Sequence, residues 1–195
     1  MALPPIEIAA VVLAIAYVVL AARSSNWCWP VGFVSSALWA YQVWVAYDLL
    51  FDAALNGFYA VISVVGFLKW RRSGERPADP GPITELSLGA HAVYIACGVA
   101  LTLLLAPLAE RLAGAALAYP DALTTVGSVI GTVLLIQRRL SNWLYFIVMD
   151  VIYVWLYLDR GSPVFAGLFV VYVGLAAYGY MAWRREAAAQ VALTA

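Results

Sequence analysis

The sequence predicts an all-α integral membrane protein with seven transmembrane helices. Of its 195 residues, 65% are hydrophobic and 11% are charged, whereas a soluble domain has about 45–50% apolar and about 25% charged residues. The apolar residues fall into seven runs, most of them close to the roughly 17–25 residues that cross a bilayer core. These runs cover residues 5–22, 31–47, 50–68, 86–106, 121–136, 142–158 and 163–182.

The basic residues between these runs predict the orientation of the chain. The first run has no basic residue before it and is followed by Arg23, so we interpret it as a retained helix that enters with its N-terminus outside. Alternating from there places most of the basic residues inside, as the positive-inside rule requires. We therefore expect an N-out, C-in protein. The inner side holds Arg23, Lys69, Arg71, Arg72, Arg76, Arg138, Arg139, Arg184 and Arg185, and the outer side holds Arg111 and Arg160.

The third and seventh runs are similar in sequence. A shift of 113 residues lays 55–72 over 168–185, and both segments end in Gly-x-x-x-Trp-Arg-Arg. Because both runs end inside, we expect two parallel three-helix repeats, a transporter architecture with the substrate site near the midplane. The predicted repeats cover 5–72 and 120–186, with a cytoplasmic loop and linker helix over 73–107 and a cytoplasmic tail over 187–195. The identical pairs are Leu55/Leu168, Tyr59/Tyr172, Gly66/Gly179, Trp70/Trp183, Arg71/Arg184 and Arg72/Arg185.

An acidic residue, Asp150, stands near the middle of the sixth run. Helical spacing places it on one face with aromatic side chains. A carboxylate at bilayer depth usually has a function, and aromatic faces attract cations. No Lys or Arg lies within any run, which leaves His91 as the one internal basic candidate to pair with Asp150. We therefore predict half of a site for an organic cation on this face, which carries Trp143, Phe146, Asp150, Tyr153 and Tyr157.

The remaining polar residues suggest no enzymatic chemistry. The chain has one histidine, two cysteines in different helices, and no metal-binding or phosphate-binding motif, so we expect no cofactor, no metal and no nucleic-acid partner. An intramembrane enzyme would need a nucleophile with its base, and a non-transporting membrane subunit would need no internal repeat. We expect His91 and Tyr94 to face lipid or a partner subunit.

Small and aromatic residues elsewhere have structural interpretations. We expect the Gly and Trp residues of the repeated ending to close each repeat at the inner interface. The hydroxyl residues of the fifth run either line the substrate path or allow close helix approach; they are Thr124, Thr125, Ser128 and Thr132.

Several short motifs resemble the nicotinamide riboside transporter family (PnuC type). They are Asn-Trp-Cys-Trp-Pro-Val-Gly at 26–32, Leu-Asn-Gly-Phe-Tyr at 55–59, the segment 63–70, Asp121 with Ser128, Asn142-Trp143, and Gly-Tyr-Met-Ala-Trp at 179–183. The resemblance implies the 3+1+3 helix arrangement that this family shares with the SWEET sugar transporters. It also implies facilitated diffusion of a vitamin nucleoside across the inner (plasma) membrane, trapping by a cytoplasmic kinase, and a homotrimer among membrane lipids.

The same resemblance identifies candidate substrate-binding residues. In nicotinamide riboside carriers the sixth span resembles Trp-x-x-Trp-x-x-x-Asn and lines the substrate; here these positions are Trp143, Phe146 and Asp150. Because Asp150 replaces an amide with a carboxylate, thiamine is an alternative to a nicotinamide riboside-type substrate, and both are aromatic cations. Membrane anchoring by Trp143, and helix–helix hydrogen bonds by Asn56 and Tyr59, are the structural alternatives. The candidates are Trp143, Phe146, Asp150, Tyr153, Asn56, Tyr59, Tyr172 and Trp29.

Overall fold

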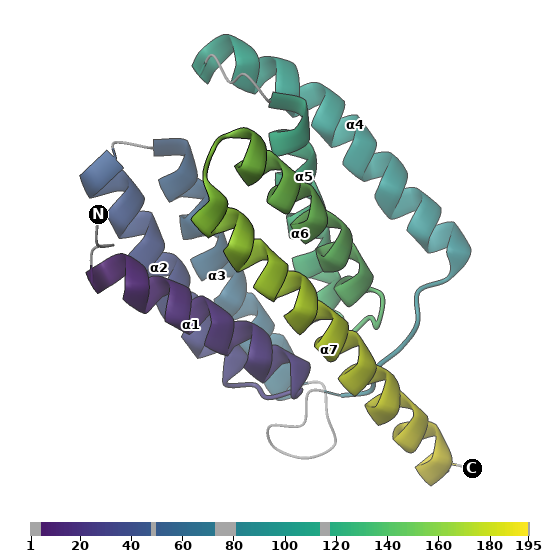
Figure 1. Ribbon diagram of the computed structural model, residues 1–195. Coiled ribbons are helices and arrows are strands. Elements are labelled where there is room, and N and C mark those ends of the chain that lie inside the picture. The colour runs from purple at the N-terminus through teal and green to yellow at the C-terminus, as the bar shows by residue number, and fades with distance from the viewer. Residues whose placement is uncertain (1–4, 48–49, 73–80, 114–117, 195) are drawn as a thin grey trace. The chain divides into compact units, whose positions relative to one another are not determined.

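The chain folds into helices that follow the predicted apolar runs closely (Figure 1). The computed structural model describes residues 5–47, 50–72, 81–113 and 118–194. Most of the predicted loop over 73–82 lies outside these residues. The helices are α1 (Pro5–Ala22), α2 (Cys28–Tyr47), α3 (Leu50–Arg72), α4 (Leu88–Ala113), α5 (Ala118–Ile136), α6 (Asn142–Asp159) and α7 (Pro163–Thr194).

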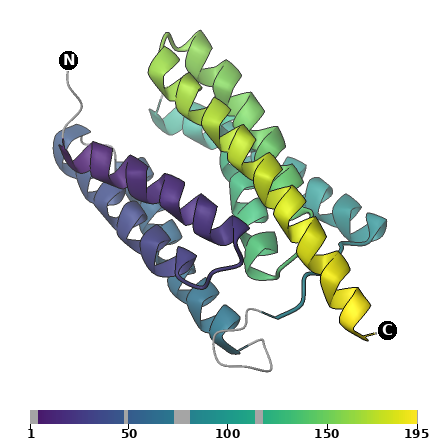
Figure 2. The same cartoon turned by 60° about the horizontal axis from the view of Figure 1, so that its bottom comes forward.

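Two helices are longer than the hydropathy pattern predicts. α4 continues through Pro107 to Ala113; the prediction that it ends at residue 106 is wrong, because proline is tolerated inside membrane helices. α7 extends beyond residue 182 to Thr194, and Figure 2 shows its yellow C-terminal end running on past α6. The predicted tail is therefore largely helical, because the segment after Trp183 is rich in alanine, a strong helix former.

Four of the described helices are long and apolar enough to cross a membrane, namely α1, α4, α5 and α7. The others carry more aromatic and polar residues, as α6 does with Asn142, Asp150 and Asp159. Length and apolarity together identify an integral membrane protein.

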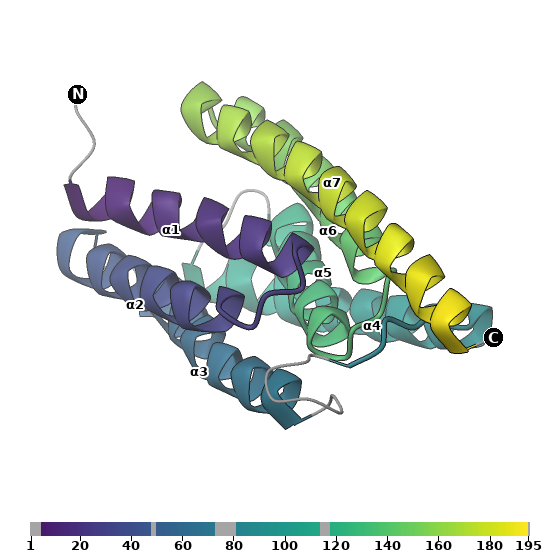
Figure 3. The same cartoon turned by 90° about the horizontal axis from the view of Figure 1, so that it is seen from below.

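The chain divides into two compact units, residues 1–82 and 83–195. In the first unit α2 packs against both α1 and α3, and lies between them in Figure 3. Buried polar contacts join α1 to α2. The Ser35 hydroxyl donates to the Ala10 carbonyl at 2.8 Å, and Gln42 Nε2 donates to Glu7 Oε1 at 3.2 Å. Burial of these groups is tolerated because each has a hydrogen-bond partner.

In the second unit the helices pack in chain order. α4 packs against α5, α5 against α6, and α6 against α7. His91 of α4 stacks on Tyr145 of α6 with ring centroids 5.8 Å apart, and its Nδ1 lies 3.2 Å from the Tyr145 hydroxyl. Tyr94 accepts a hydrogen bond from Gln137 Nε2 at 3.4 Å. The expectation that His91 and Tyr94 face lipid or a partner subunit is therefore wrong, because both hold α4 to its own unit.

A tryptophan seated on a glycine closes the first repeat. The indole of Trp29, at the start of α2, lies directly against Gly66 of α3: a Cβ added to Gly66 would fall 2.5 Å from the Trp29 ring. Trp70 completes the cluster edge-on, with ring centroids 5.2 Å apart. Both tryptophans are at most 1% exposed. Glycine is required here because any side chain would separate α2 from α3.

The second repeat has the same cluster. Trp143, at the start of α6, lies against Gly179 of α7, where an added Cβ would fall 2.7 Å from the ring. Trp183 meets Trp143 edge-on, with ring centroids 5.5 Å apart. The repeated Gly and Trp residues therefore have the structural role predicted for them, and the sequence repeat is also a repeat of packing.

The turn that precedes each cluster also repeats. Ser24 and Arg138, which are 114 residues apart, have φ angles of 54° and 56°. Each is the left-handed residue of a helix-ending Schellman motif. The paired bonds run from Ser24 N–H to Ala21 O (3.0 Å) and from Ser25 N–H to Leu20 O (2.9 Å), and from Arg138 N–H to Leu135 O (3.0 Å) and from Arg139 N–H to Leu134 O (2.9 Å).

Replacing Ser24 with glycine is expected to stabilise the first unit. A left-handed conformation costs a non-glycine residue about 1–2 kcal/mol, and part of this should be recovered, giving a gain of about 0.5–1 kcal/mol. Thermal unfolding in detergent measures the change. Ser25→Gly is the matched control, because the φ angle of Ser25 is not positive; a gain equal to that of Ser24→Gly would contradict the argument.

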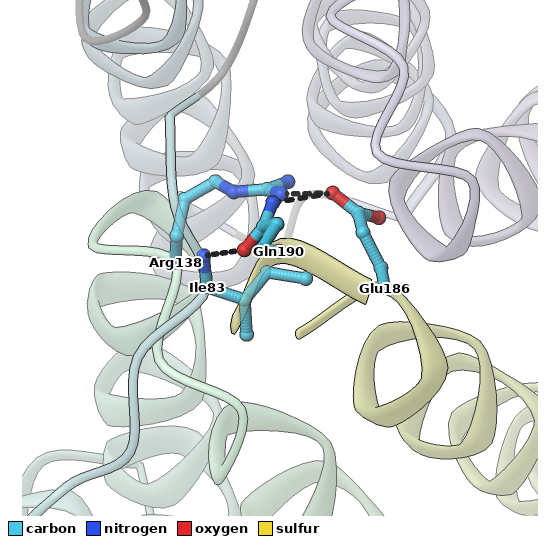
Figure 4. Close-up of polar contacts among 4 residues, drawn as sticks. All are labelled: Ile83, Arg138, Glu186 and Gln190. Carbon is cyan, nitrogen blue, oxygen red and sulfur yellow. Dashed lines mark hydrogen bonds and ion pairs between the residues drawn. The ribbon is translucent and has the colours of Figure 1, made fainter. Parts of the chain in front are cut away.

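In the second unit the left-handed residue also anchors the end of α7 (Figure 4). The Arg138 guanidinium lies 4.7 Å from the centre of the Trp183 ring and forms an ion pair of 2.6 Å with Glu186. Gln190 Nε2 donates to Glu186 at 3.4 Å, and Gln190 Oε1 accepts from the Ile83 backbone N–H at 3.0 Å. These contacts tie the segment before α4, the α5–α6 turn and the α7 extension together.

Removing the acid of this ion pair should destabilise the second unit. The Arg138 side chain is 4% exposed and that of Glu186 is 34% exposed, so water compensates only part of the loss. We expect Glu186→Ala to lower the free energy of unfolding by about 2 kcal/mol, less than for a fully buried pair. Arg185→Ala, at an exposed position of the same helix turn, is the control, and an equal effect of both variants in thermal unfolding would refute the role of the pair.

Candidate functional site

α6 places a buried carboxylate in the middle of a membrane-embedded helix bundle. Asp150 is 9% exposed and lies near Tyr153 of α6 and Tyr172 of α7. Among the described residues, no Lys, Arg or His forms an ion pair with it. A buried charge without a fixed counter-charge is costly, and either a bound cation or protonation of the carboxylate would remove this cost.

Aromatic rings from α6 and α7 stack on one another, beginning at Tyr153, one turn after Asp150. Tyr153 stacks on Phe169 with centroids 4.5 Å apart, and Tyr157 stacks on both Phe169 (5.3 Å) and Phe165 (5.4 Å). Tyr172 meets Phe169 edge-on at 5.6 Å. The predicted aromatic face of α6 thus extends onto α7, and offset stacking of this kind also stabilises the helix pair.

Phe146 and Trp143 occupy the other side of Asp150 along α6. Phe146 lies against Gly131 of α5, where an added Cβ would be 3.1 Å from its ring, and its centroid is 6.5 Å from that of Trp143. Trp143 is only 2% exposed. Its indole is therefore a packing element of the α6–α7 pair, whereas Phe146 is half-buried and leaves part of its ring accessible. Five candidates, Trp143, Phe146, Asp150, Tyr153 and Tyr172, lie in this one unit.

The other three candidates belong to the first unit. Trp29 packs in the cluster with Gly66 and Trp70 described above. Asn56 and Tyr59 are half-buried on α3, and Tyr59 lies near Tyr17 of α1. Both Asn56 and Tyr59 have polar or ring contacts within the structure. Their positions one turn apart place them on one face of α3.

Two hydroxyl residues of α5, Thr124 and Thr132, bond to carbonyls of their own helix. Thr124 Oγ1 donates to the carbonyls of Pro120 (3.1 Å) and Asp121 (2.9 Å), and Thr132 Oγ1 donates to that of Ser128 (2.9 Å). Thr124 is fully buried and Thr132 is 6% exposed. Thr124 and Thr125 also form side-chain hydrogen bonds with Tyr153 of α6. These bonds hold α5 and α6 together, which favours close helix approach over lining of a path for Thr124 and Thr132.

The arrangement can bind a flat cation without covalent chemistry. It has rings for stacking, a carboxylate for the charge and tyrosine hydroxyls for hydrogen bonds. In the described residues no group of three or more His, Cys, Asp and Glu side chains is placed to hold a metal ion.

Comparison with known proteins identifies the family. The family described as "Nicotinamide mononucleotide transporter" matches residues 4–185. The structure is similar to the crystal structure of "the Vitamin B3 transporter PnuC", with a TM-score of 0.75 and 25% sequence identity, over 93% of this chain and 81% of that one. Among curated proteins, none matches the chain. The chain therefore belongs to the nicotinamide mononucleotide transporter family, a family of integral membrane proteins.

Proposed function

We propose that the protein imports a nicotinamide riboside-type vitamin, a cationic aromatic nucleoside-like compound, by facilitated diffusion. The observation that carries this proposal is the buried Asp150, which has aromatic neighbours and no ion pair among the described residues. A pyridinium ring satisfies both features at once, since it stacks on aromatic rings and carries the missing positive charge. Membership of a family named for a pyridinium compound supports the same class of substrate.

The charge around Asp150 favours a nucleoside over a nucleotide. A phosphate group is bound in proteins by Arg, Lys or helix N-termini. Tyr153 and Tyr172, the titratable groups near Asp150, carry no positive charge. A phosphate brought beside this carboxylate would be repelled, so the unphosphorylated form is the better ligand. Phosphorylation in the cytoplasm would then trap the product, because the phosphorylated form cannot leave by the same route.

The transport step needs no coupled ion. A monovalent cation that moves towards a negative interior gains about 2.3 kcal/mol per 100 mV. We therefore propose a uniporter in which Phe146, Asp150, Tyr153 and Tyr172 bind the substrate, with Trp143 holding α6 in place. Trp29, Asn56 and Tyr59 stay candidates of the first repeat. Proton coupling through Asp150 is an alternative mechanism.

Thiamine is the second candidate substrate. It is also an aromatic cation, and Asp150 stands where the resemblance predicts asparagine in nicotinamide riboside carriers. The test is the uptake of radiolabelled nicotinamide riboside and thiamine into vesicles that contain the purified protein, compared with empty vesicles. We expect nicotinamide riboside to enter faster. Faster entry of thiamine would favour the alternative, and entry of neither compound above the empty-vesicle rate would refute the proposal.

The distribution of basic residues supports the proposed orientation of the chain in the membrane. The excess of Lys and Arg in the loops predicted to be internal supports an N-out, C-in chain. We propose the inner (plasma) membrane as its location, a homotrimer as its assembly by family resemblance, and no enzymatic activity.

A further inference from the structure

Two glycines of α5 receive side chains of α6. Gly127 and Gly131 are four residues apart and therefore share a face of α5. A Cβ added to Gly131 would lie 3.1 Å from Cε1 and Cζ of Phe146, and one added to Gly127 would lie 2.8 Å from Cγ of Met149. Both glycines are buried. Phe146 and Met149 thus rest directly on the backbone of α5.

The two side chains that contact these glycines are close to Asp150 on α6, and at 100° per residue both lie on the same side of it around the helix, at about 40° for Phe146 and about 100° for Met149. Met149 immediately precedes Asp150, and Phe146 is one turn before it. A third such glycine, Gly179 of α7, contacts Trp143. Side chains of α6 pack directly on the backbones of both α5 and α7. Rotation of α6 about its axis would therefore make these side chains clash with a neighbouring backbone. This packing therefore holds Asp150 at one rotational position about the axis of α6.

The first repeat contains the same aromatic–glycine pair with the helices exchanged. There Tyr17 of α1 lies against Gly32 of α2, where an added Cβ would be 2.8 Å from the Tyr17 ring. With the 114-residue displacement of the repeated turns, Tyr17 corresponds to Gly131, and Gly32 corresponds to Phe146. Either helix can thus supply the ring that fills this space. In the second repeat, which contains Asp150, the ring is Phe146 on the middle helix. In the first repeat the position equivalent to Asp150 is Ser36.

We infer that Gly127 and Gly131 are specificity-determining positions that orient Asp150 towards the positive charge of the substrate. This inference rests on the proposed function, since it assigns these glycines to the same substrate helix. They are positioning residues, because they act through the rotation of α6 and not by contact with the ligand.

The test compares a cation with its uncharged counterpart. Uptake of nicotinamide riboside and of its reduced, uncharged dihydro form is measured in vesicles with the full-length protein, and the ratio of their apparent KM values is the readout. We expect Gly127→Ala and Gly131→Ala to reduce the preference for the cation roughly tenfold. A loss of folded protein alone would slow both compounds equally and leave the ratio unchanged.

Two further variants separate positioning from general damage. Gly127→Ala combined with Met149→Ala removes the side chain that the new Cβ would displace, and should restore the native ratio. Gly167→Ala on α7, where an added Cβ meets nothing within 4 Å, should keep the native KM ratio. If Gly127→Ala folds poorly, the KM ratio of Gly131→Ala tests the inference instead, because the added Cβ at residue 131 requires only a small displacement of the Phe146 ring.

The outcomes for this inference and for the proposed function differ. A wild-type protein that carries neither compound overturns the proposed function whatever the glycine variants do. A wild-type protein that prefers the cation, together with folded Gly127→Ala and Gly131→Ala variants that keep the same preference, overturns the glycine inference alone. Failure of the double variant to restore the ratio also overturns it.

Discussion

Replacing Asp150 with asparagine is expected to weaken the apparent affinity for nicotinamide riboside roughly tenfold or more, because this removes about 1.4 kcal/mol or more of attraction for the cation. Uptake of the uncharged dihydro form should stay near the native rate, since asparagine keeps the size and a hydrogen-bonding group of aspartate. The measurement is the KM of each compound in vesicles containing the variant.

Asp159→Asn is the matched control for this variant. Asp159 ends the same helix but is exposed, so its neutralisation should leave both KM values unchanged. If thiamine is the substrate, Asp150→Asn should instead move the preference from thiamine towards nicotinamide riboside. Unchanged KM values for all three compounds would show that the carboxylate takes no part in recognition.

Alanine at Gly66 or Gly179 should give the largest loss of stability in the chain. Either Cβ would lie within 2.7 Å of a rigid, fully packed indole, and neither Trp29 nor Trp143 has space to move. Overpacking of this kind costs about 1–3 kcal/mol, and more where the neighbour cannot yield. Thermal unfolding in detergent should therefore show a decrease of about 3 kcal/mol for each variant.

Open glycines of the same helices provide the comparison. An added Cβ at Gly57 of α3 or Gly174 of α7 meets nothing within 4 Å, so alanine there should be neutral, or stabilising by up to about 1 kcal/mol through helix propensity. If Gly179→Ala were as stable as Gly174→Ala, the packing of Trp143 on Gly179 would not be what holds α6 against α7.

The helices and the repeat could be predicted from the sequence because both depend on local signals. Apolar run length located the seven helices of the described residues, and the Gly-x-x-x-Trp-Arg-Arg ending located the structural repeat. Run length failed at Pro107 and after Trp183, where the helix continues although the local signal for a membrane span has ended.

Contacts between helices were harder to predict, because they depend on which faces meet. His91 was expected to face lipid or a partner subunit, but it stacks on Tyr145. This contact could not be predicted, because the sequence pattern of either helix alone does not determine how α4 is rotated relative to α6. The seats at Gly127 and Gly131 had a visible signal in their four-residue spacing, but this spacing does not say which side chains they receive. The left-handed turns at Ser24 and Arg138 lack the glycine that normally marks them.

The central claim, that the protein carries an organic cation without a coupled ion, is tested most directly by its response to membrane potential. Vesicles with the wild-type protein are given radiolabelled nicotinamide riboside and an inside-negative potential of about 100 mV, which is worth about 2.3 kcal/mol for a monovalent cation. We expect roughly 50-fold accumulation at equilibrium, and equal concentrations on the two sides when the potential is removed. Equal concentrations in the presence of the potential, or uptake no faster than in empty vesicles, would contradict it.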